Sequence, residues 1–311
     1  MKLGFVIPFV GPAVTSATGL SAFCRGLEDL GYDTLWVGDR LVTPVDMHST
    51  YPGKEQPYPP QMTRYLDPVL LWTVAATATS RVRLNASTLS TFYYEPTHLA
   101  RLLTTLDVLS DGRLDVGVGL GWMKDEFDIA RGADWHRRGR MLDDLLAFLH
   151  EWWTTTPVSW NSEFISLPPV HADLRPVQAG GPPIRIGGAS EAAMRRVGRS
   201  GTGWLGVEGL QDSDHLWSIA RRAAQDAGRD PDALKTAVRI NLEPGTSVDS
   251  VADRLEGFAD SGIDEAILDA FAMFPTLDQL LDFASQIIAR SRNHGEGLTA
   301  SNNSSFAKGR S

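Results

Sequence analysis

The sequence predicts an α/β fold of the (β/α)8 TIM-barrel type, a closed ring of parallel strands surrounded by helices. Apolar runs of strand length alternate strictly with helix-length segments along the 311 residues, which is typical of a parallel sheet with helical crossovers. Eight such units fit into about 290 residues, which favours one closed barrel; an open, doubly wound sheet is the alternative. Residues 1–290 are therefore predicted to form one barrel domain. The polar, aperiodic residues 291–311 are predicted to form a disordered tail.

The predicted strands are short apolar runs bounded by polar or turn-forming residues. They lie at Leu3–Phe9, Thr34–Val37, Val82–Leu89, Arg113–Gly119, Ile184–Gly188, Trp204–Val207, Ala237–Leu242 and Glu265–Phe271. Each is followed by a predicted helix, and these helices lie at Gly19–Leu30, Pro68–Thr79, Pro96–Ser110, Arg137–Trp153, Glu191–Ser200, Asp214–Ala227, Val248–Ser261 and Leu277–Arg290. Gly31 follows the first helix as a good C-cap residue, and Pro96 stands in the first turn of the third.

Two longer segments have no periodicity and are predicted to be irregular insertions in the barrel. Residues 43–66 follow the second strand and are rich in Pro, Tyr and Gly, and residues 154–182 precede the fifth strand. The first insertion is expected at the rim formed by the C-terminal ends of the strands, where barrels of this type carry their chemistry. It could act as a lid.

The composition argues against several classes of partner. The formal net charge is −9, from 29 basic and 38 acidic residues, and no basic block stands out, so nucleic acid is not an expected partner. No apolar run approaches the length of a membrane span, so no membrane association is expected. The N-terminus MKLGFVIPF lacks the pattern of a signal peptide, and a cytoplasmic location is expected. The histidines are scattered without paired spacing, so no metal site is predicted.

The stretch GVGLGWMKDEF ends the fourth predicted strand with three alternate glycines, Gly117, Gly119 and Gly121. It matches neither the GxxxxGK pattern of a Walker loop nor the GxGxxG pattern after the first strand of a dinucleotide-binding fold. Two interpretations stay open. Small residues here could allow close packing inside the barrel, or they could let a flat ligand approach the backbone.

A second glycine cluster, in PPIRIGGASEAAMRR, lies between the fifth strand and its helix. The backbone N–H groups at a helix N-terminus bind anions, and Gly187 and Gly188 would let a phosphate come close. Ser190 could cap the helix, contact the anion, or do both. An ordinary capped turn without a ligand is the alternative.

These motifs together resemble the bacterial luciferase-like flavin and deazaflavin oxidoreductases. The similarity is carried by GGASEAA, by GVGLGWMKDEF and by LARLLTTLDVLSDGRL before it, and it extends from about Leu3 to Arg290. Within that superfamily, GVGLGWMKDEF most resembles the actinobacterial oxidoreductases that use coenzyme F420, a deazaflavin. The resemblance implies a barrel with the tricyclic ring of F420 in its mouth, with FMN as the alternative cofactor, and it also implies a homodimer.

The resemblance also implies which residues contact the cofactor. The family supports the ring on a bulge of the third strand that contains a non-prolyl cis peptide, and the matching position is Ser87–Thr88 in NASTLS. The family's phosphate site and the carboxylate near the polar edge of the ring match further residues. The full implied set is Asp39, Ser87, Thr88, Gly187, Gly188, Ala189 and Ser190.

Two departures from the family pattern bear on the reaction. Deazaflavin-dependent alcohol and sugar-phosphate dehydrogenases carry a histidine after the Asp39 position and a glutamate after the last glycine, where this chain has Arg40 and Trp122. Oxidation of an alcohol needs a base for the hydroxyl proton, which histidine or glutamate would supply. Reduction of an activated double bond, or oxygenation, fits Arg40 and Trp122 better. Arg40 could instead hold an anionic substrate or the coenzyme.

The expected reaction is hydride transfer between reduced F420 and a small organic substrate. No catalytic residue is assigned, and the candidates are Asp39, Arg40 and His136. The candidate substrate contacts are Phe9, Arg40, Phe92, Tyr93 and Trp122. The alternatives are an FMN-dependent monooxygenase that uses reduced flavin and oxygen, a non-catalytic flavin-binding protein, and a phosphate-binding isomerase on the same barrel.

Overall fold

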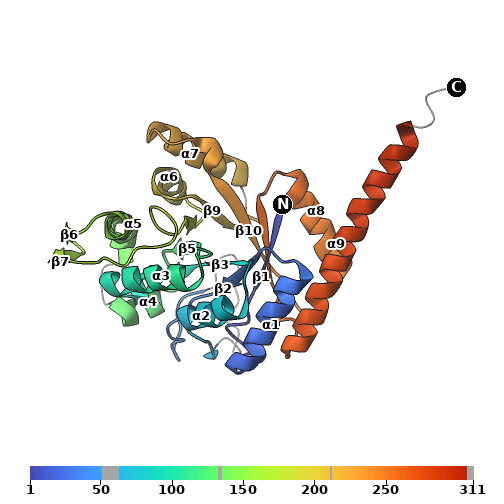
Figure 1. Ribbon diagram of the computed structural model, residues 1–311, viewed down its shortest axis with the longest axis horizontal. Helices are drawn as coiled ribbons and strands as arrows, with labels where there is room; N and C mark the ends of the chain where they lie inside the picture. Colours follow the sequence, from blue (N-terminus) through green and yellow to red (C-terminus); the bar gives the residue numbers. More distant parts are fainter. Residues whose placement is uncertain (51–62, 132–134, 211, 307–311) are drawn as a thin grey trace.

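The computed structural model of the chain describes residues 1–50, 63–131, 135–210 and 212–306. Within these residues the main element is a parallel sheet with strand order β3-β2-β1-β11-β10-β9-β8-β5-β4, surrounded by helices (Figure 1). Its strands are β1 (Lys2–Val6), β2 (Thr34–Val37), β3 (Arg83–Ala86), β4 (Leu89–Ser90), β5 (Val116–Gly119), β8 (Ile184–Gly187), β9 (Gly203–Val207), β10 (Lys235–Asn241) and β11 (Glu265–Asp269).

The sheet closes on itself through the third predicted strand. β3 and β4 are the two halves of that strand, interrupted at Ser87 and Thr88. β3 pairs with β2, whereas β4 pairs with β5. A bridge between Leu84 and Leu114 also joins the third strand to the segment that leads into β5. With β3 and β4 counted as one strand, the predicted (β/α)8 barrel is confirmed.

The helices follow the strands in the predicted order. They are α1 (Ala17–Leu30), α2 (Pro68–Ala78), α3 (Pro96–Leu109), α4 (Lys124–Arg131), α5 (Arg138–Thr154), α6 (Glu191–Ser200), α7 (Ser213–Asp226), α8 (Val248–Asp260) and α9 (Leu277–Phe306). Gly31 ends α1 in the left-handed conformation, with φ of 100°, as its C-cap prediction requires. Asp67 caps the start of α2 by accepting hydrogen bonds from the N–H groups of Val69 and Leu70.

Two strands and one helix were not predicted. The segment 154–182, expected to be irregular, contains an antiparallel hairpin of β6 (Val158–Asn161) and β7 (Ser166–Val170). Its Val158 is fully buried and its Trp160 packs against the core, so the hairpin is stabilised by packing that is invisible in a local pattern. Helix α4 lies in the loop after β5 and carries Asp125 and Glu126 in its first turn, where acidic side chains are favourable.

The predicted boundary between barrel and tail, at residue 290, lies within helix α9. Helix α9 continues to Phe306 and extends away from the barrel (Figure 1), although residues 291–311 were expected to be disordered. The sequence from Leu277 to Phe306 contains no proline, the residue that most strongly breaks a helix. Residues 307–311 lie outside the described residues, and the division into barrel and tail stays a prediction.

The first insertion, residues 43–66, is described only in part, because residues 51–62 lie outside the described residues. Its described beginning is attached to α4, since the carboxylate of Asp125 accepts hydrogen bonds from the N–H groups of His48 and Ser49 at 3.2 and 2.8 Å. A bridge between Val10 and Tyr65 holds its end against the segment after β1. Its action as a lid stays a prediction.

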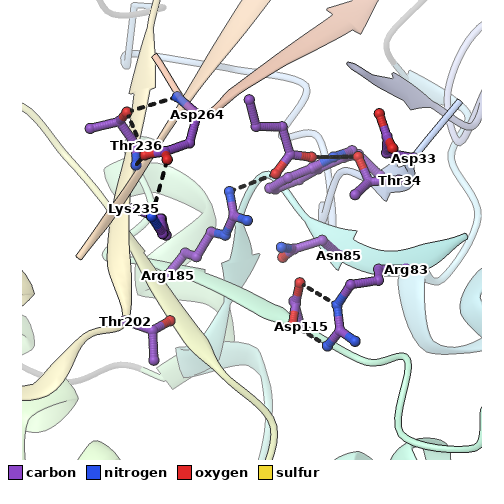
Figure 2. Close-up of polar contacts among 12 residues, drawn as sticks. Asp33, Thr34, Arg83, Asn85, Asp115, Arg185, Thr202, Lys235, Thr236 and Asp264 are labelled. Carbon is purple, nitrogen blue, oxygen red and sulfur yellow. Dashed lines mark hydrogen bonds and ion pairs between the residues drawn. The ribbon is translucent and has the colours of Figure 1, made fainter. Parts of the chain in front are cut away.

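The N-terminal ends of the strands enclose a buried polar cluster (Figure 2). Arg185 of β8 forms an ion pair with Glu265 of β11 at 2.7 Å, and the indole N–H of Trp36 donates to the same carboxylate at 3.0 Å. Arg83 binds Asp115 through its Nε at 3.0 Å. At this pole of a barrel, such contacts serve stability rather than chemistry. The site must therefore be sought at the opposite pole.

None of the helices in the described ranges is long and apolar enough to cross a membrane. Among the same residues, no group of three or more His, Cys, Asp or Glu side chains is arranged to hold a metal ion.

Candidate active site

The C-terminal ends of β2, β4 and β5 bring a group of polar and aromatic side chains together. Parallel strands of a barrel end at one rim, so residues that follow different strands meet there. Asp39 and Arg40 follow β2, Tyr93 and Tyr94 follow β4, and Glu126 follows β5 on α4. Asp39, Arg40 and Tyr93 were named as candidates from the sequence, and the contacts below show that they form one cluster with Tyr94 and Glu126.

Asp39 is buried in this cluster, with 8% of its surface exposed. Its Oδ2 accepts a hydrogen bond from the backbone N–H of Ser90 at 2.8 Å, and the hydroxyl of Tyr94 also bonds to its carboxyl group. Burial raises the pKa of Asp39 to about 7, and the negative charge of Glu126 adds to the effect. Asp39 can therefore gain or lose a proton near neutral pH.

Glu126 is the second carboxylate of the cluster and is fully buried. Its Oε2 lies 3.0 Å from Nη2 of Arg40, and the hydroxyl of Tyr93 donates to the same oxygen. Its Oε1 accepts from the backbone N–H groups of Leu41 and Val42 at 2.6 and 3.0 Å. Glu126 therefore holds the chain after β2 and balances the charge of Arg40.

Arg40 also covers an aromatic ring. Its guanidinium carbon lies 5.0 Å from the centre of the Trp122 ring, a distance at which a cation and an aromatic face attract. Arg40 thus has an internal anion and an internal aromatic partner. Binding of an anionic substrate by Arg40, considered from the sequence, would have to compete with both.

Phe9 and Phe92, two predicted substrate contacts, are buried at the rim. The ring of Phe9 lies against the backbone of Gly38, where a Cβ atom would approach it to 2.1 Å. Phe92 packs edge-on against Phe127 with ring centres 5.5 Å apart. His136 lies exposed in the short 3-10 helix η3 (Trp135–Arg137). The catalytic role of His136 and the substrate contacts stay predictions.

The third strand changes direction at Ser87 and Thr88, and the peptide bond between them is cis, as the resemblance predicted. The side chain of Thr88 lies between two glycines of neighbouring strands. A Cβ atom on Gly119 would approach the Thr88 hydroxyl to 2.4 Å, and one on Gly187 would approach its methyl group to 2.7 Å. A Cβ atom on Gly117 would approach the carbonyl oxygen of Ala86 to 1.8 Å. The glycines of β5 therefore admit the third strand, which favours the packing interpretation for Gly117 and Gly119.

The second glycine cluster forms the turn between β8 and α6. Gly188, Ala189 and Ser190 are exposed, and Gly188 has φ of 137°. Ser190 is the N-cap of α6, and its side chain accepts a hydrogen bond from the N–H of Ala193. The hydroxyl oxygen thus serves the helix, and the first N–H groups of α6 are left to bind other acceptors. Gly187, before this turn, packs against Thr88, and the binding of an anion at the turn stays a prediction.

A model of the luciferase-like monooxygenase family matches residues 1–306. The chain belongs to the luciferase-like monooxygenase family. An uncharacterized protein of Mycobacterium tuberculosis is 30% identical over 257 residues, which cover 81% of this chain and 88% of that protein. The family resemblance inferred from the glycine motifs is therefore confirmed.

Solved structures with the same fold carry the names of different enzymes. The monooxygenase RslO1 from Streptomyces bottropensis superposes with a TM-score of 0.75 at 21% identity, covering 94% of this chain and 99% of its own. An F420-dependent secondary alcohol dehydrogenase, in complex with an F420-acetone adduct, gives a TM-score of 0.73 at 15% identity and covers 93% and 98% of the two chains. At these identities the likeness establishes the fold alone.

One pair of polar residues at the mouth of this luciferase-like barrel was not among the candidates expected from the sequence. Arg239 of β10 donates to the carbonyl oxygen of Ser87 at 2.6 Å and forms an ion pair with Asp269 of β11. The candidate site residues named from the sequence stopped at Ser190, before the last three strands. The sequence does contain a pattern that indicates Asp269, because this residue ends the apolar run EAILD. A charged residue at the C-terminal end of a barrel strand indicates the site.

Proposed function

We propose that the protein is an F420-dependent oxidoreductase that transfers a hydride between the reduced deazaflavin and a small organic substrate and reduces an activated double bond. The observation that carries this proposal is Asp39, a buried carboxyl group with a pKa of about 7 in hydrogen-bond contact with Tyr94. Reduction of a polarised double bond requires a proton as well as a hydride, and an acid with a pKa near the working pH is the most effective donor.

In this proposal the residues at the mouth of the barrel have different roles. The backbone of Gly188, Ala189 and Ser190 would hold the phosphate, and Ser87 and Thr88 would support the ring. When bound, the coenzyme would supply the hydride. Asp39 and Tyr94 would hold the proton at the edge of the ring, while Phe9, Phe92, Tyr93 and Trp122 would border the substrate. The buried pair of Arg40 and Glu126 would keep this wall rigid and neutral, which favours an uncharged substrate over an anionic one.

An FMN-dependent monooxygenase is the second candidate, because RslO1, one of the structural neighbours, is a monooxygenase. The mouth supports it less well, since a proton donor beside the ring is a requirement of reduction. A non-catalytic flavin-binding protein would bind the cofactor and consume no acceptor. The three candidates differ in cofactor, in oxygen use and in turnover.

The deciding experiment is a parallel fluorescence titration of the purified full-length protein with F420 and with FMN. Binding of F420 in the micromolar range or tighter, without comparable FMN binding, followed by anaerobic oxidation of reduced F420 by compounds with an activated C=C bond, is the expected result. Binding of FMN alone with oxygen uptake would replace the proposal by the monooxygenase. Binding of F420 without oxidation by any acceptor would favour a storage protein.

The phosphate site has its own test, the variant Gly188→Ala. A Cβ atom there would approach that of Ala193 to 2.9 Å, at the turn where the phosphate is proposed. Gly228→Ala is the matched control, because Gly228 also has positive φ, 70°, but has open space around it and lies after α7. Cofactor affinity is expected to fall by at least about tenfold in Gly188→Ala and to stay unchanged in Gly228→Ala.

A further inference from the structure

Arg239 connects three strands at the mouth of the barrel. Its Nη1 donates to the carbonyl oxygen of Ser87 at 2.6 Å and lies 3.5 Å from the Oγ of the same residue. Its Nη2 forms an ion pair with Oδ2 of Asp269. The guanidinium of β10 is therefore held between the end of β11 and the junction of β3 and β4, which precedes it by 152 residues in the sequence.

The two charges of this pair are not equally accessible. The side chain of Asp269 is fully buried, whereas that of Arg239 is 14% exposed. The accessible end of the pair is thus the cation, beside Ser87. A buried ion pair is weak evidence of a contribution to stability, because the desolvation of both charges offsets their attraction. The burial of this pair is therefore not explained by stability alone, and the guanidinium of Arg239 is a candidate for a role in the active site.

We propose that Arg239 is a positioning residue that fixes the peptide at Ser87 and provides a positive charge at the surface against which the cofactor ring binds. This inference rests on the proposed function, or equally on its FMN alternative, because both place a ring against Ser87 and Thr88. A hydride adds two electrons and one proton to such a ring, so the reduced ring carries one more negative charge than the oxidised ring until it takes up a second proton. A fixed cation beside it stabilises the reduced form more than the oxidised form. Arg239 therefore tunes the preference of the protein for reduced cofactor.

The test compares the dissociation constants of oxidised and reduced cofactor, measured anaerobically by fluorescence, with whichever of F420 and FMN the wild-type protein binds. The main variant is Arg239→Gln/Asp269→Asn, which removes both charges and so avoids an unpaired buried carboxylate. The ratio of the reduced to the oxidised dissociation constant is expected to rise about tenfold, which equals about 30 mV for a two-electron couple. Arg239→Lys keeps the charge without the two-sided hydrogen bonding, and its ratio is expected to lie near that of the wild type.

The matched control is Arg185→Gln/Glu265→Gln, which neutralises a second buried arginine–carboxylate pair, at 2.7 Å, at the opposite ends of the strands (Figure 2). This control is expected to leave the ratio unchanged. An equal weakening of both redox forms in the Arg239 variant, or the same change in the control, would overturn the proposal and leave Arg239 a structural residue. If the double variant does not fold, Arg239→Lys decides alone. A tenfold difference between its ratio of reduced to oxidised dissociation constants and that of the wild type would overturn the proposal. Failure of the wild-type protein to bind either cofactor would overturn the proposed function, and this inference with it.

Discussion

Arg40 and Glu126 form an ion pair of 3.0 Å whose side chains are only 8% and 0% exposed. They come from the ends of two different strands, β2 and β5, and the pair holds the loop after Asp39 against α4. Because the carboxylate also accepts from Tyr93 and from the backbone after Arg40, its removal would affect both the fold and the shape of the mouth.

Glu126→Gln is therefore expected to lower the free energy of unfolding by about 3 kcal/mol, because it leaves the buried charge of Arg40 without its partner. Urea denaturation measures this change. The double variant Arg40→Met/Glu126→Gln is expected to recover part of the loss. Asp128→Asn is the control, since its pair with Lys124 is about half exposed on both sides and is worth at most about 0.5 kcal/mol. A loss in Glu126→Gln no larger than in this control would contradict the prediction.

Asp39 makes stability depend on pH in a direction that can be derived. Its folded-state pKa is raised from 3.8 to about 7, so between these values the folded protein binds more protons than the unfolded chain. Stability from this group is then fully present below pH 3.8 and is lost as the pH rises through about 7, by up to about 4 kcal/mol. In Asp39→Asn this loss is absent. The difference in unfolding free energy between Asp39→Asn and the wild type should therefore grow in favour of the variant from pH 5 to pH 8, and a constant difference would refute the assignment.

Tyr94→Phe is expected to shift the pH profile of reduction. The Tyr94 hydroxyl bonds to the Asp39 carboxyl group, and loss of a donor to a carboxylate raises its pKa further. If protonated Asp39 supplies the proton, kcat/KM falls above pH 7 in the wild type, and in Tyr94→Phe the fall moves to higher pH. Tyr93→Phe is the matched control, because its hydroxyl donates to Glu126 instead. An identical profile in wild type and Tyr94→Phe would exclude Asp39 as the titrating donor.

The glycines of the barrel offer a test of packing that does not depend on function. Gly117→Ala would bring a Cβ atom to 1.8 Å from the carbonyl oxygen of Ala86. The backbone would have to shift to avoid this clash, and the free energy of unfolding is expected to fall by at least about 2 kcal/mol. Gly257→Ala, within α8 and with open space around it, is expected to stabilise the protein by about 0.5–1 kcal/mol. Chemical denaturation of both variants measures the two changes, and destabilisation by Gly257→Ala or tolerance of Gly117→Ala would contradict this account.

Much of the site could be predicted because its residues lie where an apolar strand gives way to a polar loop. A polar residue after an apolar strand, such as Asp39, marks the rim once the barrel is inferred from the alternation. Asp39, Arg40 and Tyr93 were all found in this way. The hairpin β6–β7 and helix α4 were not predicted, since the periodic pattern of each is too short to be distinguished from a loop.

The sequence by itself determined the order of the barrel strands and of the helix that follows each, the closure into a barrel, the family, and the polar residues after the second and third strands, because these depend on local periodicity and on recognisable motifs. Only the tertiary structure decided how these residues are paired. Glu126 binds Arg40 rather than solvent, Thr88 takes the space left by Gly119 and Gly187, and Arg239 reaches Ser87. Contacts between residues so far apart in the chain depend on the closure of the barrel, and no local pattern encodes the distance between two strands that meet only when the ring is complete.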